Sequence, residues 1–334
     1  MSAALGVIGL AVVVAVVIFY FIQRRRVVPE WANFFSARQW ADFQRLVRDH
    51  FRRQNKRCQI QDGVVVVPEE ADSAEKYGLS NLAQHCGHAP RDQWESIIEG
   101  HFHVLDKGRT ELSELENKAK DFSQVSHMLA VRIWPREYAD QIGLSNLVCR
   151  EDLEGTVTTL VLDLPSSIRN VQPDEAKSWD KNYHDLFDLG LENVWKNCQP
   201  ERREETIPPG VRVMFLTSDN FFVASHALLL ERHPQLIGRY GSLVAIPHRH
   251  ILICHPIENA NVVEAVNHLI FFAHGMEKEG PGSISPFLYW YRDGQFRTLP
   301  YVLNPDKKAI EFTPPDEFVQ LLNEVCAAGE QPGG

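Results

Sequence analysis

Two groups of histidines are the side chains of this sequence best suited to chemistry. The first group comprises His248 and His250, on either side of Arg249, with His255 shortly after them. An imidazole titrates near neutral pH, so it can transfer protons or bind a metal. We take His248, His250 and His255 as candidate catalytic residues, together with Asp163, whose carboxylate ends an apolar run.

No recognised catalytic motif surrounds these candidates. Cys254 precedes His255, but adjacent residues of a strand point to opposite faces, so the two cannot form a thiolate–imidazole dyad. The chain has no G-x-S-x-G serine elbow and no H-E-x-x-H zinc motif. It also lacks the glycine-rich phosphate loops of nucleotide-binding proteins. Turn chemistry and strand ends explain the same residues without catalysis.

The second group comprises His85 and His88, followed later in the chain by His101 and His103. Zinc uses three or four such ligands around a tetrahedron. A helix between the two pairs would separate them by about 15 Å or more, at 1.5 Å per residue. We therefore predict no metal site and no cofactor, with these four histidines as the alternative metal ligands.

The elements that must position the first group are predicted as short strands. Short apolar runs rich in β-branched residues indicate strands that are buried on both faces. Such runs occupy residues 211–216, 221–224, 243–246 and 251–254. Residues 128–134, which alternate, and residues 156–162 are predicted as two further strands. Asp163 follows the strand over 156–162, and His248 lies in the turn before residues 251–254. Apolar residues recur at helical spacing over residues 260–273, which predicts a helix laid across two hairpins.

The remaining elements also mix hairpins with helices, so the sequence predicts an α+β fold. The dipeptides Asp62-Gly63 and Asp293-Gly294 are favoured hairpin turns. Ser36 and Gln39 form a capping box that predicts the start of a helix. Further helices are predicted over residues 77–86, 90–105, 173–197 and 318–325.

Charge is distributed unevenly along the chain, whose net charge is -10. Residues 1–23 carry no charged side chain, whereas residues 24–57 hold ten Lys/Arg and three Asp/Glu. The remainder holds 24 basic and 41 acidic residues, a balance of -17. An acidic body disfavours nucleic acid as a partner, because phosphate binding needs clustered Lys and Arg. The six cysteines are scattered without a C-x-x-C pair, which is typical of reduced thiols.

The uncharged N-terminal stretch predicts a membrane anchor. About 20 apolar residues span a ~30 Å hydrocarbon core, and residues 3–22 provide them. Arg24, Arg25 and Arg26 follow directly, whereas a cleaved signal peptide would carry its positive charge first. The positive-inside rule then predicts a single-pass protein of the inner or plasma membrane, with its N-terminus outside and its body cytoplasmic.

The first helix of the body is both amphipathic and basic. Opposite its apolar face it carries Arg38, Arg45, Arg48, Arg52 and Arg53. Lying near the anchor, these arginines and Arg24–Arg26 are predicted membrane-proximal basic residues that favour an anionic bilayer surface. The alternative is a helix packed on the body with an arginine-rich face in solvent.

We predict five segments along the chain. Charged residues followed by Pro208-Pro209-Gly210 are typical of a linker, which places a boundary within residues 200–210. The segments are the anchor 1–23, a connector 24–35, α+β halves over 36–200 and 210–325, and a disordered tail 326–334.

Several phrases resemble a known family. They occupy residues 161–171, 189–193, 222–230 and 244–249. These phrases are similar to the YtpQ-like proteins, a bacterial family without an assigned activity, and the likeness runs over residues 36–297. The resemblance implies a shared α+β fold, and it implies no activity and no catalytic residue. The family lacks an N-terminal anchor, so this chain departs from it there.

The sequence predicts a membrane-anchored cytoplasmic module that binds a protein or small-molecule partner and performs no chemistry. One alternative is a metal-dependent or hydrolase-like enzyme that uses His248, His250 and His255. Another alternative is a scaffold protein whose basic helix orients it on the bilayer. Stoichiometric metal in the purified body would favour the enzyme.

Overall fold

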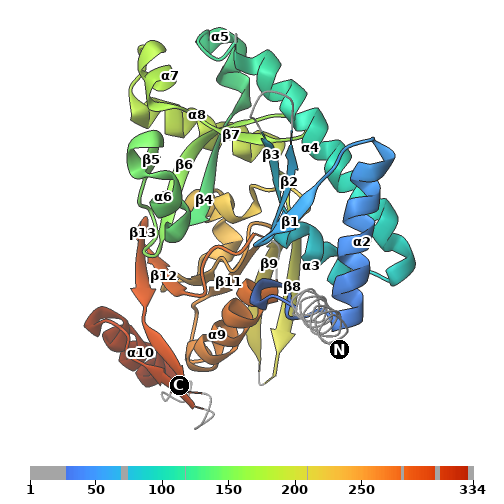
Figure 1. Ribbon diagram of the computed structural model, residues 1–334. Coiled ribbons are helices and arrows are strands. Elements are labelled where there is room, and N and C mark those ends of the chain that lie inside the picture. Colours follow the sequence, from blue (N-terminus) through green and yellow to red (C-terminus); the bar gives the residue numbers. More distant parts are fainter. Residues whose placement is uncertain are drawn as a thin grey trace, which may run out of the picture. The chain divides into compact units, whose positions relative to one another are not determined.

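The computed structural model describes residues 28–68, 74–116, 118–208, 210–279, 282–304 and 309–329 (Figure 1). Contacts between Cα atoms divide the chain into two compact units, residues 1–106 and 107–334. The predicted anchor and Arg24, Arg25 and Arg26 lie outside the described residues. Among the helices that are described, none combines the length and apolar character needed to cross a membrane.

The first unit combines helices with a three-stranded antiparallel sheet of order β1-β2-β3. Its elements are η1 (Glu30–Ala32), α2 (Ala37–Arg53), β1 (Gln59–Gln61), β2 (Val64–Pro68), β3 (Ala74–Gly78), α3 (Ser80–His88), η2 (Arg91–Gln93) and the first part of α4 (Trp94–Glu116). Asp62 and Gly63 turn between β1 and β2 with φ of 45° and 78°, which confirms the predicted hairpin. Tyr77 lies in β3, so the helix predicted from that residue begins three residues late.

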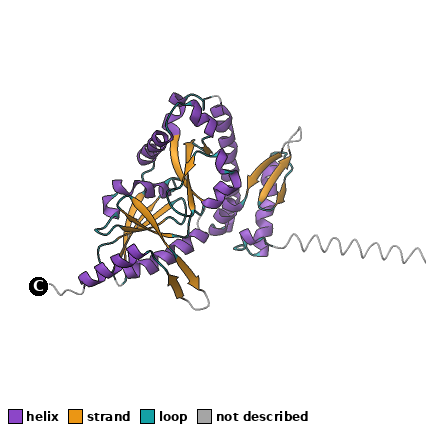
Figure 2. Ribbon diagram, turned by 90° about the vertical axis from the view of Figure 1, so that its left-hand side faces the viewer, coloured by secondary structure: helices purple, strands orange, loops and turns teal. Residues whose placement is uncertain are grey.

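Helix α2 begins at its predicted capping box. The Ser36 amide donates to Gln39 Oε1 at 2.8 Å, and the Gln39 amide donates to Ser36 Oγ at 3.3 Å. Trp40 and Phe43 on its apolar face are buried with Trp94 of α4 in the core of this unit. In Figure 2, the three-stranded sheet lies against this helical layer.

The second unit contains two main antiparallel sheets. One has the order β13-β12-β10-β11-β9-β8, and the other has the order β4-β6-β5 with β7 paired to β6. The strands are β4 (Leu129–Pro135), β5 (Cys149–Arg150), β6 (Thr156–Asp163), β7 (Ile168–Asn170), β8 (Glu201–Ile207), β9 (Val211–Thr217), β10 (Ser242–Ala245), β11 (Ile251–Pro256), β12 (Leu288–Arg292), β13 (Gln295–Leu299), β14 (Tyr301–Asn304) and β15 (Ala309–Phe312). These sheets and their helices give the mixed α+β fold that the sequence predicts.

The helices of this unit cover the sheets. They are α5 (Phe122–Val125), η3 (Ser126–Met128), α6 (Arg136–Ile142), η4 (Leu144–Asn146), α7 (Pro173–Ser178), α8 (Tyr183–Asn197), η5 (Val223–Arg232), η6 (Pro234–Leu236), α9 (Val262–Glu279) and α10 (Asp316–Gly329). Helix α10 continues to Gly329, so disorder predicted from residue 326 is wrong for residues 326–329, and residues 330–334 lie outside the described residues.

The six-stranded sheet confirms two predicted hairpins and corrects a third. Strands β10 and β11 pair antiparallel, and so do β12 and β13. The strand predicted over residues 221–224 is wrong, because η5 begins at Val223. Asn220 Oδ1 accepts from the Phe222 amide at 2.9 Å, and this local turn diverts the chain before a strand can form.

Strand β8 takes the place of that missing partner beside β9. Its pairing runs from Glu201 opposite Thr217 to Ile207 opposite Val211. It lies at the edge of the sheet, where charged side chains discourage pairing with other chains. The charged stretch predicted as a linker is thus an edge strand, and the predicted boundary does not coincide with the division at residues 106 and 107.

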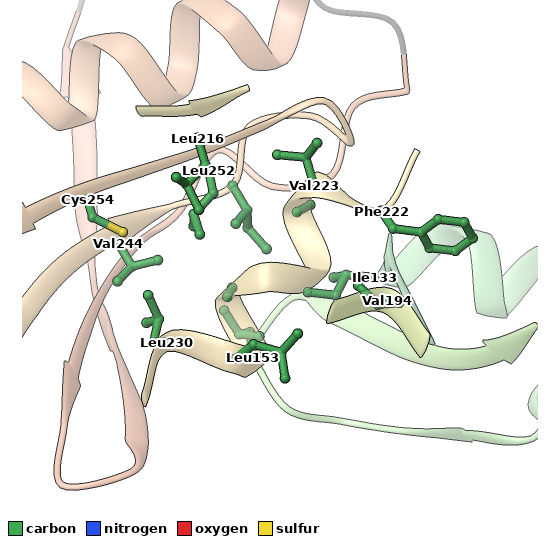
Figure 3. Close-up of a cluster of buried hydrophobic side chains, with 14 of the residues drawn as sticks. Ile133, Leu153, Val194, Leu216, Phe222, Val223, Leu230, Val244, Leu252 and Cys254 are labelled. Atoms are coloured by element: carbon green, nitrogen blue, oxygen red, sulfur yellow. The ribbon is translucent and has the colours of Figure 1, made fainter. Parts of the chain in front are cut away.

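The two faces of the six-stranded sheet bury separate cores. Leu243 and Ile253 point to the face covered by α9, where they pack with Leu269. Val244 and Cys254 alternate with them and point to the face covered by η5. Figure 3 shows this second core, in which side chains of the sheet meet those of η5, α8 and β4. The labelled residues are Ile133, Leu153, Val194, Leu216, Phe222, Val223, Leu230, Val244, Leu252 and Cys254.

Helix α8 packs closely against β4. A Cβ atom on Gly190 would lie 2.9 Å from Val131 Cγ2, so only a glycine permits this close approach. Three residues on, the Asn193 amide donates to the carbonyl oxygens of Ser126 and Leu129, both at 2.9 Å. Helix α8 therefore fixes the start of the strand that carries the site described next.

Candidate functional site

A buried arginine occupies the middle of β4. Arg132 is 6% exposed, and its Cζ lies 3.6 Å from the centroid of the Trp134 ring. Tyr138 of α6 stacks on the same ring, with centroids 4.0 Å apart and planes 6° from parallel. Two groups this close to one ring must occupy its opposite faces. The Tyr138–Trp134 stack therefore holds the Arg132 guanidinium from one side.

Hydrogen bonds fix the orientation of this stack. Trp134 Nε1 donates to Thr159 Oγ1 of β6 at 2.9 Å. Asn170 Nδ2 of β7 donates to the Tyr138 hydroxyl at 2.7 Å. Because that hydroxyl accepts from Asn170, its own proton is left to donate to another group. The four residues belong to three paired strands and the helix after β4, so the site is preorganised by the sheet.

A second arginine approaches from the turn between β10 and β11. Arg249 Cζ lies 4.5 Å from the centroid of the Phe221 ring, and Arg132 Cζ lies 5.8 Å from the same centroid. Phe221 is 41% exposed, so the shared ring opens to solvent. The Asn220 amide donates to Ser218 Oγ at 3.0 Å, which shapes the loop that presents Phe221.

The two guanidinium groups leave positive charge without a matching anion. Within the described ranges, neither Arg132 nor Arg249 takes part in an ion pair, and Arg132 Nε is buried without a hydrogen-bond partner. Burial, and then the charge of Arg249, lowers the pKa of Arg132 to about 9, so the group is still protonated at pH 7. Burial also lowers the pKa of Arg249.

Asp163 supplies a partial counter-charge at the end of β6. Asp163 lies four residues after Thr159, so the two side chains are on the same face of the sheet. Thr159 is the register partner of Arg132, so that face also holds Arg132. Burial raises the pKa of Asp163, and the positive charge of Arg132 acts against that rise. One carboxylate near Arg132 does not balance two guanidinium groups, so the site stays net positive.

The structure brings His248 and His250 to this site, but it occupies their basic nitrogens. Arg249 Nε donates to His250 Nε2 at 2.9 Å, so His250 carries its proton on Nδ1, which donates to the Ser218 carbonyl at 3.1 Å. The His250 amide donates to His248 Nδ1 at 3.3 Å. Burial lowers the pKa of both rings, that of His248 to about 4. Neither neutral imidazole presents a free basic nitrogen for proton abstraction.

A cavity of about 590 Å³ lies beside this turn. It is lined by Gln199, Glu201, Thr217, Ser218, Asp219, His248, His250 and Ile251. With its Nδ1 occupied, His248 can offer this cavity only an Nε2–H donor. The cavity can therefore hold polar groups of a ligand, while the positive charge lies at the arginines.

His255 lies apart from His248 and His250. It lies in β11, five residues after His250, which precedes the strand, and this spacing corresponds to about 16 Å at 3.3 Å per residue. Its register partner Leu243 faces α9, whereas Cys254 faces η5. His255 Nδ1 donates to the Arg212 carbonyl at 2.7 Å, and its Nε2 is buried without a partner. The three histidines of the enzyme hypothesis therefore do not form one site.

The four histidines considered as metal ligands belong to the first unit. Across the described residues, no three His, Cys, Asp or Glu side chains gather as a metal site. Burial, and then the nearby His85, lowers the pKa of His101 to about 4. His88 ends α3, and His103 lines a different cavity, beside His50.

The basic face of α2 is neutralised in part by acidic neighbours. Arg45 and Arg52 pair with Asp49 on the same helix, at 3.7 Å and 2.8 Å. Arg53 pairs with Glu99 of α4 at 3.0 Å. Exposed pairs of this kind contribute little, typically ~0.2–1 kcal/mol each, so they can open in favour of another anion. The helix therefore presents less free charge than its five arginines imply.

Comparison with models of known protein families found no match, and neither did comparison with curated proteins or with solved structures. The resemblance to the YtpQ-like proteins stays a prediction.

The sequence interpretation missed the residues at the centre of the site. Arg132 and Trp134 lie in a strand that the sequence predicts only as an element of the core, and the sequence predicts Phe221 within a strand. One signal was present: a charged residue inside an apolar run must be buried with a partner or lie at a site. The contact between Arg132 and Phe221 joins two sheets and has no local pattern in the sequence.

Proposed function

We propose that this chain is a single-pass membrane protein whose α+β body binds a small anion, a carboxylate or a phosphate, between Arg132 and Arg249. It acts as a binding module and performs no covalent chemistry there. The observation that carries the proposal is Arg132 itself: a buried guanidinium with an unpartnered Nε and a second arginine beside it.

The energetic argument starts from the cost of buried charge. An ionised group removed from water is destabilising unless an opposite charge and hydrogen bonds compensate it. Arg132 and Arg249 repel each other across Phe221, and Asp163 compensates only in part. An added anion would relieve this repulsion, which gives the folded protein a differential affinity for it.

The geometry of the donors supports a planar or tetrahedral oxyanion. Guanidinium groups bind carboxylate and phosphate through parallel N–H donors that lie in the guanidinium plane. One face of the Arg132 guanidinium lies against Trp134, so its edge is the part free to bond. The Tyr138 hydroxyl can add a further donor, since it already accepts from Asn170.

The absence of a basic nitrogen at His248 and His250 supports binding over proton transfer. Both imidazoles are neutral, with the acceptor nitrogen of each already used. The membrane anchor rests on the apolar residues 3–22 and the arginines that follow them. These features support a cytoplasmic location for the proposed ligand.

Thermal unfolding in the presence of anions tests the proposal. Phosphate, acetate and succinate are each titrated at constant ionic strength into the wild type, Arg249→Met and the control Arg212→Met. A ligand at 100 times its Kd stabilises the folded state by about 2.7 kcal/mol. We expect one or more anions to raise the Tm of the wild type and of Arg212→Met but not of Arg249→Met. An equal rise in all three proteins would refute the site.

A further inference from the structure

A second cavity of the second unit presents a negative charge, whereas the anion site presents positive charge. It has a volume of about 570 Å³ and is formed by the loop after β5, by η5 and by the β12–β13 hairpin. Its lining includes Glu231, Tyr291 and Phe296, together with Arg150, Asp152 and Arg232. None of these six residues belongs to the anion site described above.

Most charges around this cavity cancel in pairs. Arg150 Nε lies 2.9 Å from Asp152 Oδ2, and Arg232 pairs with Glu192 at 2.8 Å. Glu151 pairs with Arg136. Glu231 takes part in no ion pair within the described ranges, so its carboxylate is the uncompensated charge.

Aromatic side chains line the cavity next to that carboxylate. The Tyr291 hydroxyl donates to Glu231 Oε1 at 3.4 Å. Burial, and then the charge of Glu231, raises the pKa of Tyr291 to about 12, so the phenol stays neutral. The rings of Tyr291 and Phe296 have centroids 4.9 Å apart at an angle of 53°. Tyr291 and Phe296 both line the cavity, and the Tyr291 hydroxyl reaches Glu231, so a cation at this carboxylate lies next to aromatic groups.

We propose that this cavity binds a small organic ammonium ion, with its charge against Glu231 and its alkyl groups against Tyr291 and Phe296. A cation near an aromatic ring gains electrostatic attraction from the ring quadrupole, and alkylated ammonium ions use this contact most. A hydrated metal ion fits the cavity less well, since the cavity offers one free carboxylate and two rings in place of several oxygen ligands. The proposal stands independently of the anion site.

The test is a titration of the full-length protein in detergent with tetramethylammonium chloride and with butylammonium chloride, followed by calorimetry. Sodium chloride at the same concentration corrects for ionic strength. Glu231→Gln removes the charge yet keeps an oxygen that can accept from Tyr291. Phe296→Leu removes a ring and keeps an apolar side chain. Glu258→Gln removes an exposed carboxylate elsewhere in the unit and is the matched control.

We expect saturable binding to the wild type and to Glu258→Gln, an affinity at least tenfold lower for Glu231→Gln, and a lower tetramethylammonium affinity for Phe296→Leu. Binding of both ions supports an organic ammonium in general, and binding of butylammonium alone narrows the class to primary amines. The proposal is overturned if neither ion binds the wild type saturably, or if Glu231→Gln binds as tightly as the wild type while melting at the same temperature.

Discussion

Arg132 and Arg249 contact one aromatic ring, that of Phe221, although they belong to different sheets. Arg132 comes from β4, and Arg249 from the turn that joins β10 to β11. Two like charges beside a shared ring oppose the packing of the two sheets. We expect this repulsion to lower the stability of the protein when no anion is bound, a cost that binding sites commonly carry.

The first prediction is that Arg132→Met stabilises the ligand-free protein. Methionine keeps an unbranched apolar side chain against Trp134 while removing a buried charge. Replacing buried charge with apolar groups is often stabilising, by ~1–4 kcal/mol for ion pairs and triads. We expect the free energy of unfolding to rise by about 1 kcal/mol in urea titrations at low salt. A loss of more than about 2 kcal/mol would mean that Arg132 is fully compensated within the protein.

The second prediction concerns the close approach of α8 to β4. In Gly190→Ala, the new Cβ would lie 2.9 Å from Val131 Cγ2 and 3.2 Å from the Ala130 carbonyl carbon. Overpacking of this kind costs ~1–3 kcal/mol. Gly275→Ala on α9 is the control, because a Cβ there meets nothing within 4 Å. In a helix, that replacement should stabilise by ~0.5–1 kcal/mol. Similar Tm changes in the two variants would contradict the packing described for α8.

The third prediction is a loss of stability in mild acid through His226. This residue is 1% exposed; its Nε2 lies 3.0 Å from the Cys198 carbonyl and its Nδ1 lies 2.9 Å from His233 Nε2. The carbonyl can only accept, so Nε2 of His226 carries the proton and Nδ1 accepts from His233. A second proton on His226 would break that contact. Burial, and then His233, lowers the pKa of His226 to about 4.

The sign follows from the lowered pKa. Between pH 6.5 and pH 4 the unfolded chain binds a proton that folded His226 does not, so stability falls as pH falls. One such group contributes about 1.4 kcal/mol per pH unit. Urea unfolding of His226→Gln between pH 7.5 and pH 5 should show a shallower pH dependence than the wild type. An unchanged dependence would show that His226 is protonated in both states or in neither.

The fourth prediction concerns topology. A reporter enzyme fused after Gly334 should be active only on the cytoplasmic side, because Arg24, Arg25 and Arg26 follow the apolar stretch. Replacing these three arginines with glutamine should weaken that orientation. Reporter activity on the outer side in the wild-type chain would contradict the orientation and the proposed cytoplasmic ligand.

The sequence correctly predicted elements that are determined by residues close together in the chain. The Asp62-Gly63 turn and the capping box of Ser36 and Gln39 each depend on residues within four positions of one another, and both formed as predicted. The alternation that separates Cys254 from His255 is equally local. The linker prediction for the residues of strand β8 was wrong, because linkers and solvent-exposed edge strands share a charged composition.

The candidate site could be predicted only in part. His248, His250 and Asp163 do lie near Arg249 and Arg132, but the roles suggested for the histidines depended on free nitrogens that the fold occupies. The contact of Arg132 with Phe221 joins residues 89 positions apart in the sequence. No periodicity or motif records such a pairing, since it follows from how two sheets pack around η5.

The most direct test of the anion site is a crystal structure of the protein grown with selenate, whose selenium scatters anomalously. We predict an anomalous peak with its oxygens within hydrogen-bonding distance, ~2.7–3.2 Å, of N–H groups of both Arg132 and Arg249. The same crystals of Arg132→Met should lack that peak. Selenate bound elsewhere, with both guanidinium groups of the wild type contacting only protein atoms, would contradict the account.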